Sequence, residues 1–348
     1  MGVGETDTLK GVHSMSTQVK AGMEGTRKRT MSLRPLNSKN LVFGALFLAF
    51  VAALYVYVPS FFQMNNITQM LRQASIPGLI AIGVTFVVIC GKLDLSVGSI
   101  LSASAICSVV LYNSTGSVAL AIAAPLALGL LVGFLNGWLV AYLNLNSLIV
   151  TLAMLSIVQG LALVYTGGAD MVMRNPASTT GLGALGRGSI FAIPIPVVLA
   201  ALFACGCGLI LRFTSYGRRV FAVGGNDVAS LYSSLNVRAT VFFAYAISGL
   251  LSGMAGAVYA SRVATARHDS GQGLELLVLA MVILGGTNLF GGAGSIVRTV
   301  IGVLVIVFLQ NLLLLMGLPF YIQWIGIAII LVVVAWINVR TQRQGLAP

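Results

Sequence analysis

Long apolar runs, separated by short groups of charged residues, make up most of this chain. A helix needs about 20 apolar residues to cross the hydrocarbon layer of a membrane, so a charge-free run of that length indicates one crossing. Between Lys39 and Arg340 this pattern predicts about ten crossings. The expected spans are residues 41–59, 76–91, 95–113, 117–142, 147–166, 190–212, 241–261, 274–288, 295–316 and 319–338. The span at 274–288 is too short to cross alone.

The composition supports a membrane protein. Of the 348 residues, 58% are hydrophobic and 8% are charged, whereas a soluble domain carries roughly a quarter of its residues as charged side chains. A water-exposed surface cannot be built from so few charges. We therefore expect an all-α integral membrane protein with one transmembrane domain over residues 40–338.

The positive charges predict an orientation. Lys and Arg outnumber Asp and Glu by 20 to 8, and the cytoplasmic segments of membrane proteins carry such an excess. The cations before the first span are Lys10, Lys20, Arg27, Lys28, Arg29, Arg34 and Lys39. The N-terminus is therefore predicted to be cytoplasmic, and ten crossings return the C-terminus to the same side. Residues 1–39 are expected to form a disordered basic tail and residues 339–348 a short cytoplasmic tail.

The remaining loops follow this rule only in part. The arginines that fall on the predicted cytoplasmic side are Arg212, Arg218, Arg219 and Arg238. Those that fall on the outer side are Arg174, Arg187, Arg262 and Arg267. Because orientation accounts for most of the basic surplus, we expect membrane lipid, and no nucleic acid, as a partner.

The chain lacks the motifs of common catalytic sites. It contains no GxxxxGK[ST] phosphate loop, no HExxH and no GxSxG. A GxGxxG pattern at Gly181, Gly183 and Gly186 follows no predicted strand and falls on the outer side, so we expect a flexible loop there. The cysteines all lie in apolar spans, where free Cys acts as a small hydrophobe. We expect no catalytic residue, no metal site and no cofactor bound by this chain.

Polar groups within the membrane are costly and suggest a pathway or a site. Lys92 and Asp94 interrupt two apolar runs, either in an ordinary turn at the membrane surface or in a broken helix that lines a cavity. Neutral polar side chains in the spans suit a neutral polyhydroxylated substrate, and hydrogen bonding between helices is the alternative. The candidate pathway residues are Asp94, Ser96, Ser99, Asn136, Gln159 and Asn311. Further neutral polar residues in the spans are Thr85, Ser102 and Gln310.

Glycines at steps of four residues predict close contacts between helices, because a residue without a side chain lets two backbones approach. They are Gly129, Gly133 and Gly137, and Gly249 and Gly253.

The longest polar stretch after the N-terminal tail is the predicted cytoplasmic loop at about 213–240. Asn226 or Asp227 is expected to cap a short helix over about 228–235. An amphipathic helix in such a loop either lies in the membrane interface or docks onto a soluble partner. Periodicity alone does not distinguish the two.

An ordered set of short motifs runs through the chain. It comprises Leu93 to Ser99, Asn136 to Tyr142, Arg218 to Asn226, Leu284 to Thr287 and Gly291 to Ser295. In this set the chain, from about residue 40 to 338, resembles the permease subunits of bacterial ATP-binding-cassette (ABC) importers of the ribose/galactose/xylose group. The coupling motif of that family, Gly-Asn-x-Glu-Ala-Ala-(x)3-Gly-Ile, is matched at Gly225, Asn226 and Ala229. The departures from it are Val228 for Glu, Ser230 for Ala and Ser234 for Gly.

The resemblance implies a non-catalytic permease subunit in the bacterial inner (plasma) membrane that carries a monosaccharide or a related polyol. The implied partners are a cytoplasmic ABC ATPase subunit that holds ATP and Mg, a periplasmic or lipid-anchored sugar-binding protein, and a second permease subunit, identical or different. The residues implied to couple this chain to the ATPase are Gly225, Asn226, Asp227, Ala229 and Ser234.

The nearest alternative is the permease of a branched-chain amino-acid or nucleoside ABC importer, which shares the general design. A zwitterionic substrate favours charged recognition groups, and the spans contain few of them. An ion-driven secondary transporter needs buried charged coupling residues, and an intramembrane enzyme needs a catalytic dyad. Neither is evident in the sequence.

Overall fold

The computed structural model describes residues 58–175 and 180–319, with single residues between 322 and 332. The expected first span at 41–59 and the expected last span at 319–338 therefore lie almost entirely outside the described residues. The two predicted tails lie outside them completely.

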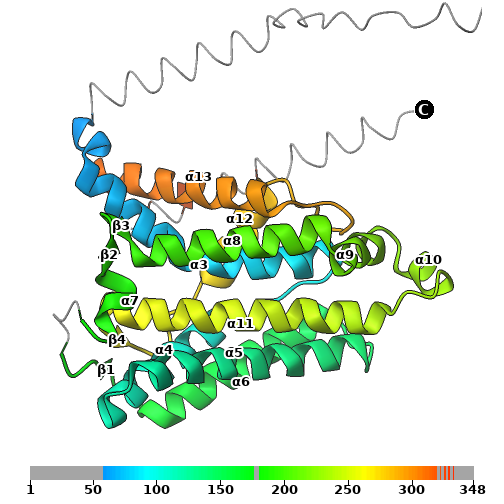
Figure 1. Ribbon diagram of the computed structural model, residues 1–348, viewed down its shortest axis with the longest axis horizontal. Coiled ribbons are helices and arrows are strands. Elements are labelled where there is room, and N and C mark those ends of the chain that lie inside the picture. The colour runs from blue at the N-terminus through cyan, green and yellow to red at the C-terminus, as the bar shows by residue number, and fades with distance from the viewer. Residues whose placement is uncertain are drawn as a thin grey trace, which may run out of the picture. The chain divides into compact units, whose positions relative to one another are not determined.

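A bundle of long helices forms the body of the described chain (Figure 1). The long helices are α3 (Met64–Ile89), α4 (Val97–Thr115), α5 (Val118–Ala141), α6 (Ser147–Thr166), α8 (Ile195–Phe213), α11 (Val237–Val263) and α13 (Ile296–Leu315). The shorter helices are the 3-10 helix η1 (Pro59–Phe62), α7 (Gly183–Arg187), α9 (Ser215–Gly225), α10 (Asp227–Tyr232) and α12 (Leu274–Leu284).

Four short strands form two antiparallel pairs at one end of the bundle. The strands are β1 (Met171–Val172), β2 (Ser189–Ile190), β3 (Ile193–Pro194) and β4 (Thr265–Ala266). β1 pairs with β4, and β2 pairs with β3 in a hairpin. Figure 1 shows the strands and α7 together at this end, here called the strand end, and α9 and α10 at the opposite end, here called the α10 end.

Seven helices of the described residues are long and apolar enough to cross a membrane. The expected eighth span, 274–288, corresponds to α12, which has only 11 residues. The prediction that this span is short is therefore confirmed. The all-α membrane interpretation is confirmed for the described residues. The total of ten stays a prediction, because two of the expected spans lie outside them.

The predicted start of the second span is wrong by about three turns. α3 begins at Met64 rather than at residue 76 and includes Arg72. The charge of Arg72 does not end the helix, because its guanidinium reaches sideways and donates to the carbonyls of Gly186 (3.3 Å) and Arg187 (2.6 Å). α11 is also longer than expected at both ends.

The expectation of a flexible loop around the GxGxxG pattern is also wrong. Residues 183–187 form α7, and Gly186 is buried. Its backbone N–H donates to the hydroxyl of Ser261 at 2.7 Å, and a methyl group on Gly186 would meet the backbone of Arg262. The small residues of this pattern are used for close packing at the strand end.

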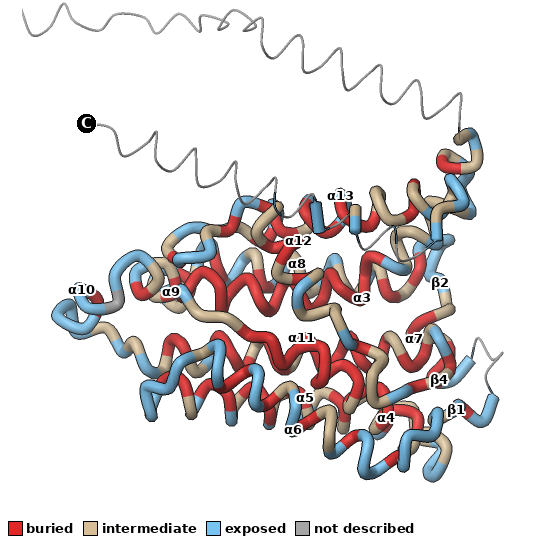
Figure 2. Tube along the Cα trace, turned by 180° about the vertical axis from the view of Figure 1, so that it is seen from behind, coloured by how far each residue is buried: buried red, intermediate tan, exposed pale blue. Residues whose placement is uncertain are grey.

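The core lies along α3 and α11. Figure 2 shows buried positions concentrated on these two helices, while α6 and the α10 end carry many exposed positions. The exposed positions of α6 are largely apolar, for example Ile157 and Val164. Large exposed aliphatic side chains along a spanning helix are expected where lipid, rather than water, is the solvent.

α5 and α11 approach each other through glycines, as predicted. A methyl group on Gly249 would collide with the carbonyl oxygen of Gly129 and with the backbone of Gly133, and one on Gly253 would meet the carbonyl of Pro125. Dispersion contacts between two closely spaced backbones are a main source of helix association in lipid. This contact therefore stabilises the centre of the bundle.

Substitution of Gly249 by Ala should destabilise the protein by roughly 1–3 kcal/mol, because the added methyl overpacks the α5–α11 contact. The matched control is Gly206→Ala on α8, where no atom of the described residues lies within 4 Å of the added methyl. The measurement is thermal unfolding of the purified protein in detergent. Equal melting temperatures for the two variants would contradict this account of the contact.

Candidate functional site

The predicted short helix in the polar loop is present as α10, at the end of the bundle. Asn226 is its N-cap, and the side-chain oxygen of Asn226 accepts a hydrogen bond from the backbone N–H of Ala229 at 2.9 Å. Asp227 is the first residue of the helix. The cap predicted from the sequence is therefore confirmed, with Asn226 rather than Asp227 in that position.

α10 presents apolar side chains to the surrounding solution. Val228 is 58% exposed, Leu231 is 60% exposed and Tyr232 is 89% exposed. Figure 1 shows this helix projecting beyond the long helices. A single exposed apolar residue is ordinary on a protein surface. Several large apolar side chains grouped on a projecting helix instead mark an interaction surface.

α9 holds α10 firmly on the bundle. Gly224 packs so closely on the carbonyl of Ile89 and on the backbone N–H of Gly292 that a methyl group has no room. The hydroxyl of Tyr216 donates to the carbonyl of Thr240 at 3.1 Å, and burial raises the pKa of this phenol above its ordinary value. α9 is therefore anchored to the ends of α3 and α11 and to the segment after α12.

Ser234 follows α10 in an unusual backbone conformation. Its φ is 58°, in the left-handed region that costs a residue with a side chain roughly 1–2 kcal/mol and costs glycine little. The coupling motif of the ribose/galactose/xylose group has Gly at this position. The left-handed backbone explains why that motif uses Gly there. The backbone N–H of Ser234 still donates to the carbonyl of Leu231 at 3.2 Å.

Asp94 is the centre of a buried hydrogen-bond network at the start of α4. One carboxylate oxygen accepts from the N–H and the hydroxyl of Ser96, at 3.1 and 2.6 Å, and the other accepts from the hydroxyl of Ser248 on α11, at 2.7 Å. The hydroxyl of Ser96 accepts from the amide of Asn136 on α5 at 2.8 Å. The network joins three helices, and Asp94 makes no ion pair with Lys92.

The break between α3 and α4 lies deep among the helices. α11 rises about 1.5 Å per residue, so Ser248 lies roughly 16 Å along it from Val237. Asp94, bonded to Ser248, is 3% exposed. The backbone N–H of Leu93 also donates to the hydroxyl of Ser147, the first residue of α6, at 3.3 Å. The choice between a broken helix and an ordinary turn stays a prediction.

Of the candidate pathway residues, four lie together. Asp94, Ser96 and Asn136 share the network, and the hydroxyl of Ser99 donates to the carbonyl of Ser96 at 2.8 Å. Gln159 lies on α6 and makes no hydrogen bond to this group. Asn311 on α13 instead exchanges two amide hydrogen bonds with Asn66 of α3, at 2.9 and 3.0 Å. The assignment of the six to a pathway stays a prediction.

A cavity of about 700 Å³ opens toward the strand end, in a place that sequence reasoning missed. Its walls come from α3, the end of α11, the segment that leads into α12, α12 itself, α13 and Ala328. The polar side chains that line it are Gln73, Tyr259, Arg262, Ser270, Gln272 and Gln310. The sequence places Gln310 within a span, where a polar residue suggests a site. The other five residues have no local sequence pattern that indicates a cavity.

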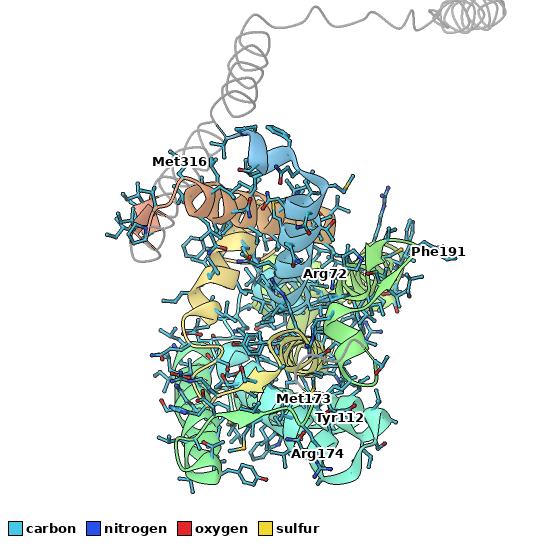
Figure 3. All side chains as sticks on the ribbon, turned by 90° about the vertical axis from the view of Figure 1, so that its left-hand side faces the viewer. Arg72, Tyr112, Met173, Arg174, Phe191 and Met316 are labelled. Atoms are coloured by element: carbon cyan, nitrogen blue, oxygen red, sulfur yellow. The ribbon has the colours of Figure 1, made fainter. Side chains whose placement is uncertain are left out.

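The strand end carries one of the two predicted groups of arginines. Figure 3 looks onto this end, where Arg72 and Arg174 are labelled and Phe191 stands at the edge. Arg267 makes ion pairs with Asp170 at 3.4 Å and with Asp269 at 3.0 Å. The other group, Arg212, Arg218, Arg219 and Arg238, lies on and beside α9 at the α10 end.

Comparison with known proteins adds an independent observation. The family described as "Branched-chain amino acid transport system / permease component" matches residues 66–339. The ribose import permease protein RbsC of Bacillus subtilis is 40% identical over 283 residues, which cover 79% of this chain and 85% of that protein. RbsC of Escherichia coli is 32% identical over 328 residues, covering 94% and 100% of the two chains.

A third relative is the L-arabinose ABC transporter permease protein AraH of Azospirillum brasilense, 36% identical over 303 residues that cover 86% of this chain and 88% of that protein. No solved structure matches the chain. The family match covers most of the sequence, and the helices described above have the length and composition of membrane spans. The chain therefore belongs to this family of transport-system permease components and is a multi-pass protein of the bacterial inner membrane.

Proposed function

We propose that this chain is the permease subunit of an ABC importer that moves a monosaccharide or a related polyol across the inner membrane. The observation that carries the proposal is its likeness, over most of its length, to permeases named for ribose and L-arabinose. ATP and Mg are held by a separate ATPase subunit. A second permease subunit, identical or different, completes the pathway.

The proposed orientation has the α10 end in the cytoplasm. The arginines on and beside α9 support it, because cytoplasmic segments are enriched in Lys and Arg. In this orientation the strand end faces the periplasm and receives a soluble or lipid-anchored sugar-binding protein. The permease can favour one of its states only through contacts that differ between those states, so both partners act by docking.

The proposed contact with the ATPase is the surface formed by Val228, Leu231 and Tyr232 on α10. Gly225, Asn226, Asp227, Ala229 and Ser234 build and end this helix, and we retain them as the coupling residues. Because α9 is anchored on α3 and α11, a displacement of α10 is passed to the spanning helices. Energy from ATP therefore enters this subunit as mechanical movement.

The substrate class is supported by uncharged polar groups. A zwitterion such as leucine is best held by an anionic and a cationic group together. The described spans offer neutral hydroxyls and amides in far larger number than charges, which suits sugar hydroxyl groups. The family description names branched-chain amino acids, so the amino-acid importer remains the alternative to exclude.

Deletion of the gene in its host should abolish uptake of at least one of radiolabelled D-ribose, L-arabinose and D-xylose, and expression in trans should restore it. Leucine and uridine uptake serve as comparisons for the two alternative substrate classes. Loss of leucine or uridine uptake with all three sugar uptakes intact would reject the proposed sugar function.

Gly225→Trp should leave the permease folded but reduce uptake at least tenfold, because a central steric clash typically removes about 2 kcal/mol or more from an interface. No atom of the described residues lies within 4 Å of a methyl group added at Gly225, so the first atom of a side chain has room there. Gly206→Trp, on an equally open position of α8, is the matched control. Membrane insertion, uptake and ATP hydrolysis by the assembled importer are measured, and unchanged uptake in Gly225→Trp would exclude this docking surface.

Asp94→Ala should lower the melting temperature, because the hydroxyls of Ser96 and Ser248 lose their acceptor at a cost of roughly 1–3 kcal/mol. Asp94→Asn keeps one acceptor and should melt closer to the wild type. Uptake per folded molecule should be nearly normal in Asp94→Asn if the network only holds the start of α4. Normal melting with lost uptake in this variant would instead support a place for Asp94 on the pathway.

A further inference from the structure

The cavity at the strand end lies within a single subunit and brings together segments that are distant in sequence. Gln73 and Pro77 come from α3, Arg262 from the end of α11, and Gln272 and Gln310 from the segment before α12 and from α13. Its volume of about 700 Å³ falls within the range of small-molecule sites. The cavity lies on the side that faces the periplasm in the proposed orientation.

Three amide side chains of this wall are free to bind a ligand. Within the described residues, the side chains of Gln73, Gln272 and Gln310 make no hydrogen bond. Pro77 has no N–H to donate to the carbonyl of Gln73, one turn earlier, so this side of α3 also offers a backbone acceptor. Gln73 and Gln272 are exposed and Gln310 is partly buried, so all three amides are accessible to a polar ligand in the cavity.

The chemistry of the wall selects a neutral occupant. Each amide both donates and accepts, as do the hydroxyls of Tyr259 and Ser270, and this matches sugar hydroxyl groups. Apolar side chains, among them Ile76 and Val307, provide surface for the C–H faces of a sugar ring. A zwitterion finds the cation Arg262 but no carboxylate among the lining residues.

Glu275 does not supply that carboxylate. It lies next to the lining residue Leu274, but one of its oxygens accepts from the backbone N–H of Gly273 at 3.1 Å. Its other oxygen lies against Gly98 of α4. The cavity therefore lacks an acidic partner for an ammonium group or a metal cation among the described lining residues.

The floor of the cavity is formed by α12. α12 follows Gly273, with φ 84°, and precedes Gly286, with φ 78°. Glycine adopts this left-handed backbone at little cost, which explains its presence at both ends of the helix. The segment after α12 reaches Gly292, which packs against α9.

We infer that this cavity is a monosaccharide-binding site within each permease subunit, which holds the sugar on the periplasmic side. The inference rests on the proposed function, because it assigns a substrate site to the proposed importer. It is separate from the predicted pathway set of Asp94, Ser96, Ser99 and Asn136. Gln310 and Gln272 are its central binding residues.

The test uses the complete importer in proteoliposomes and measures uptake of D-ribose, L-arabinose and D-xylose against concentration. Gln272→Leu and Gln310→Leu should each raise the half-saturating concentration about tenfold, since each removes roughly one hydrogen bond to the sugar. Gln69→Leu on α3, an exposed position that is not among the lining residues, is the matched control and should behave as wild type. Unchanged half-saturation in both cavity variants overturns the inference.

A second measurement does not depend on how these variants fold. In a background without the native cysteines, Gln310→Cys is labelled with a bulky thiol reagent, and a transported sugar should slow the labelling while leucine should not. Labelling that no sugar slows, with normal sugar uptake by the unmodified importer, overturns the site and leaves the proposed function standing. Absence of all sugar uptake by the wild-type importer overturns the proposed function instead.

Discussion

The break between α3 and α4 sets the constraint on which the rest of the bundle depends. Backbone that leaves the helical conformation within a membrane must find its hydrogen-bond partners in protein, because lipid offers none. Here the carbonyl of Leu93 accepts from the hydroxyl of Tyr245 at 2.7 Å, and Asp94 accepts from Ser96 and Ser248. α11 supplies two of these partners, so its central position and close contact with α5 follow from the need to complete the break.

The two ends of the described bundle are built for different tasks. The strand end uses short strands, α7 and arginine side chains that bond to backbone carbonyls, and it borders an open cavity lined by apolar and polar side chains. The α10 end presents a short capped helix with exposed apolar side chains. α12 lies between these regions and joins the floor of the cavity to the segment that touches α9.

The features that the sequence revealed are those determined locally. The long helices follow from charge-free runs, and the cap of α10 follows from Asn226. The α5–α11 contact follows from glycines repeated at steps of four residues, which begin at Gly129 on α5 and at Gly249 on α11. The start of α3 was missed because Arg72 is satisfied by partners more than 100 positions later in the chain. The cavity was missed for the same reason: its amides belong to segments that only the fold brings together.

The contact at Gly224 has a mechanical consequence. Backbone atoms of α9 touch backbone atoms of Ile89 and Gly292 with no side chain between them. A side chain can change rotamer and absorb a small shift, whereas two main chains in direct contact have no such freedom. This junction should therefore behave as a stiff joint, at which a push on α9 becomes a step of the same size in the spanning helices instead of being dissipated.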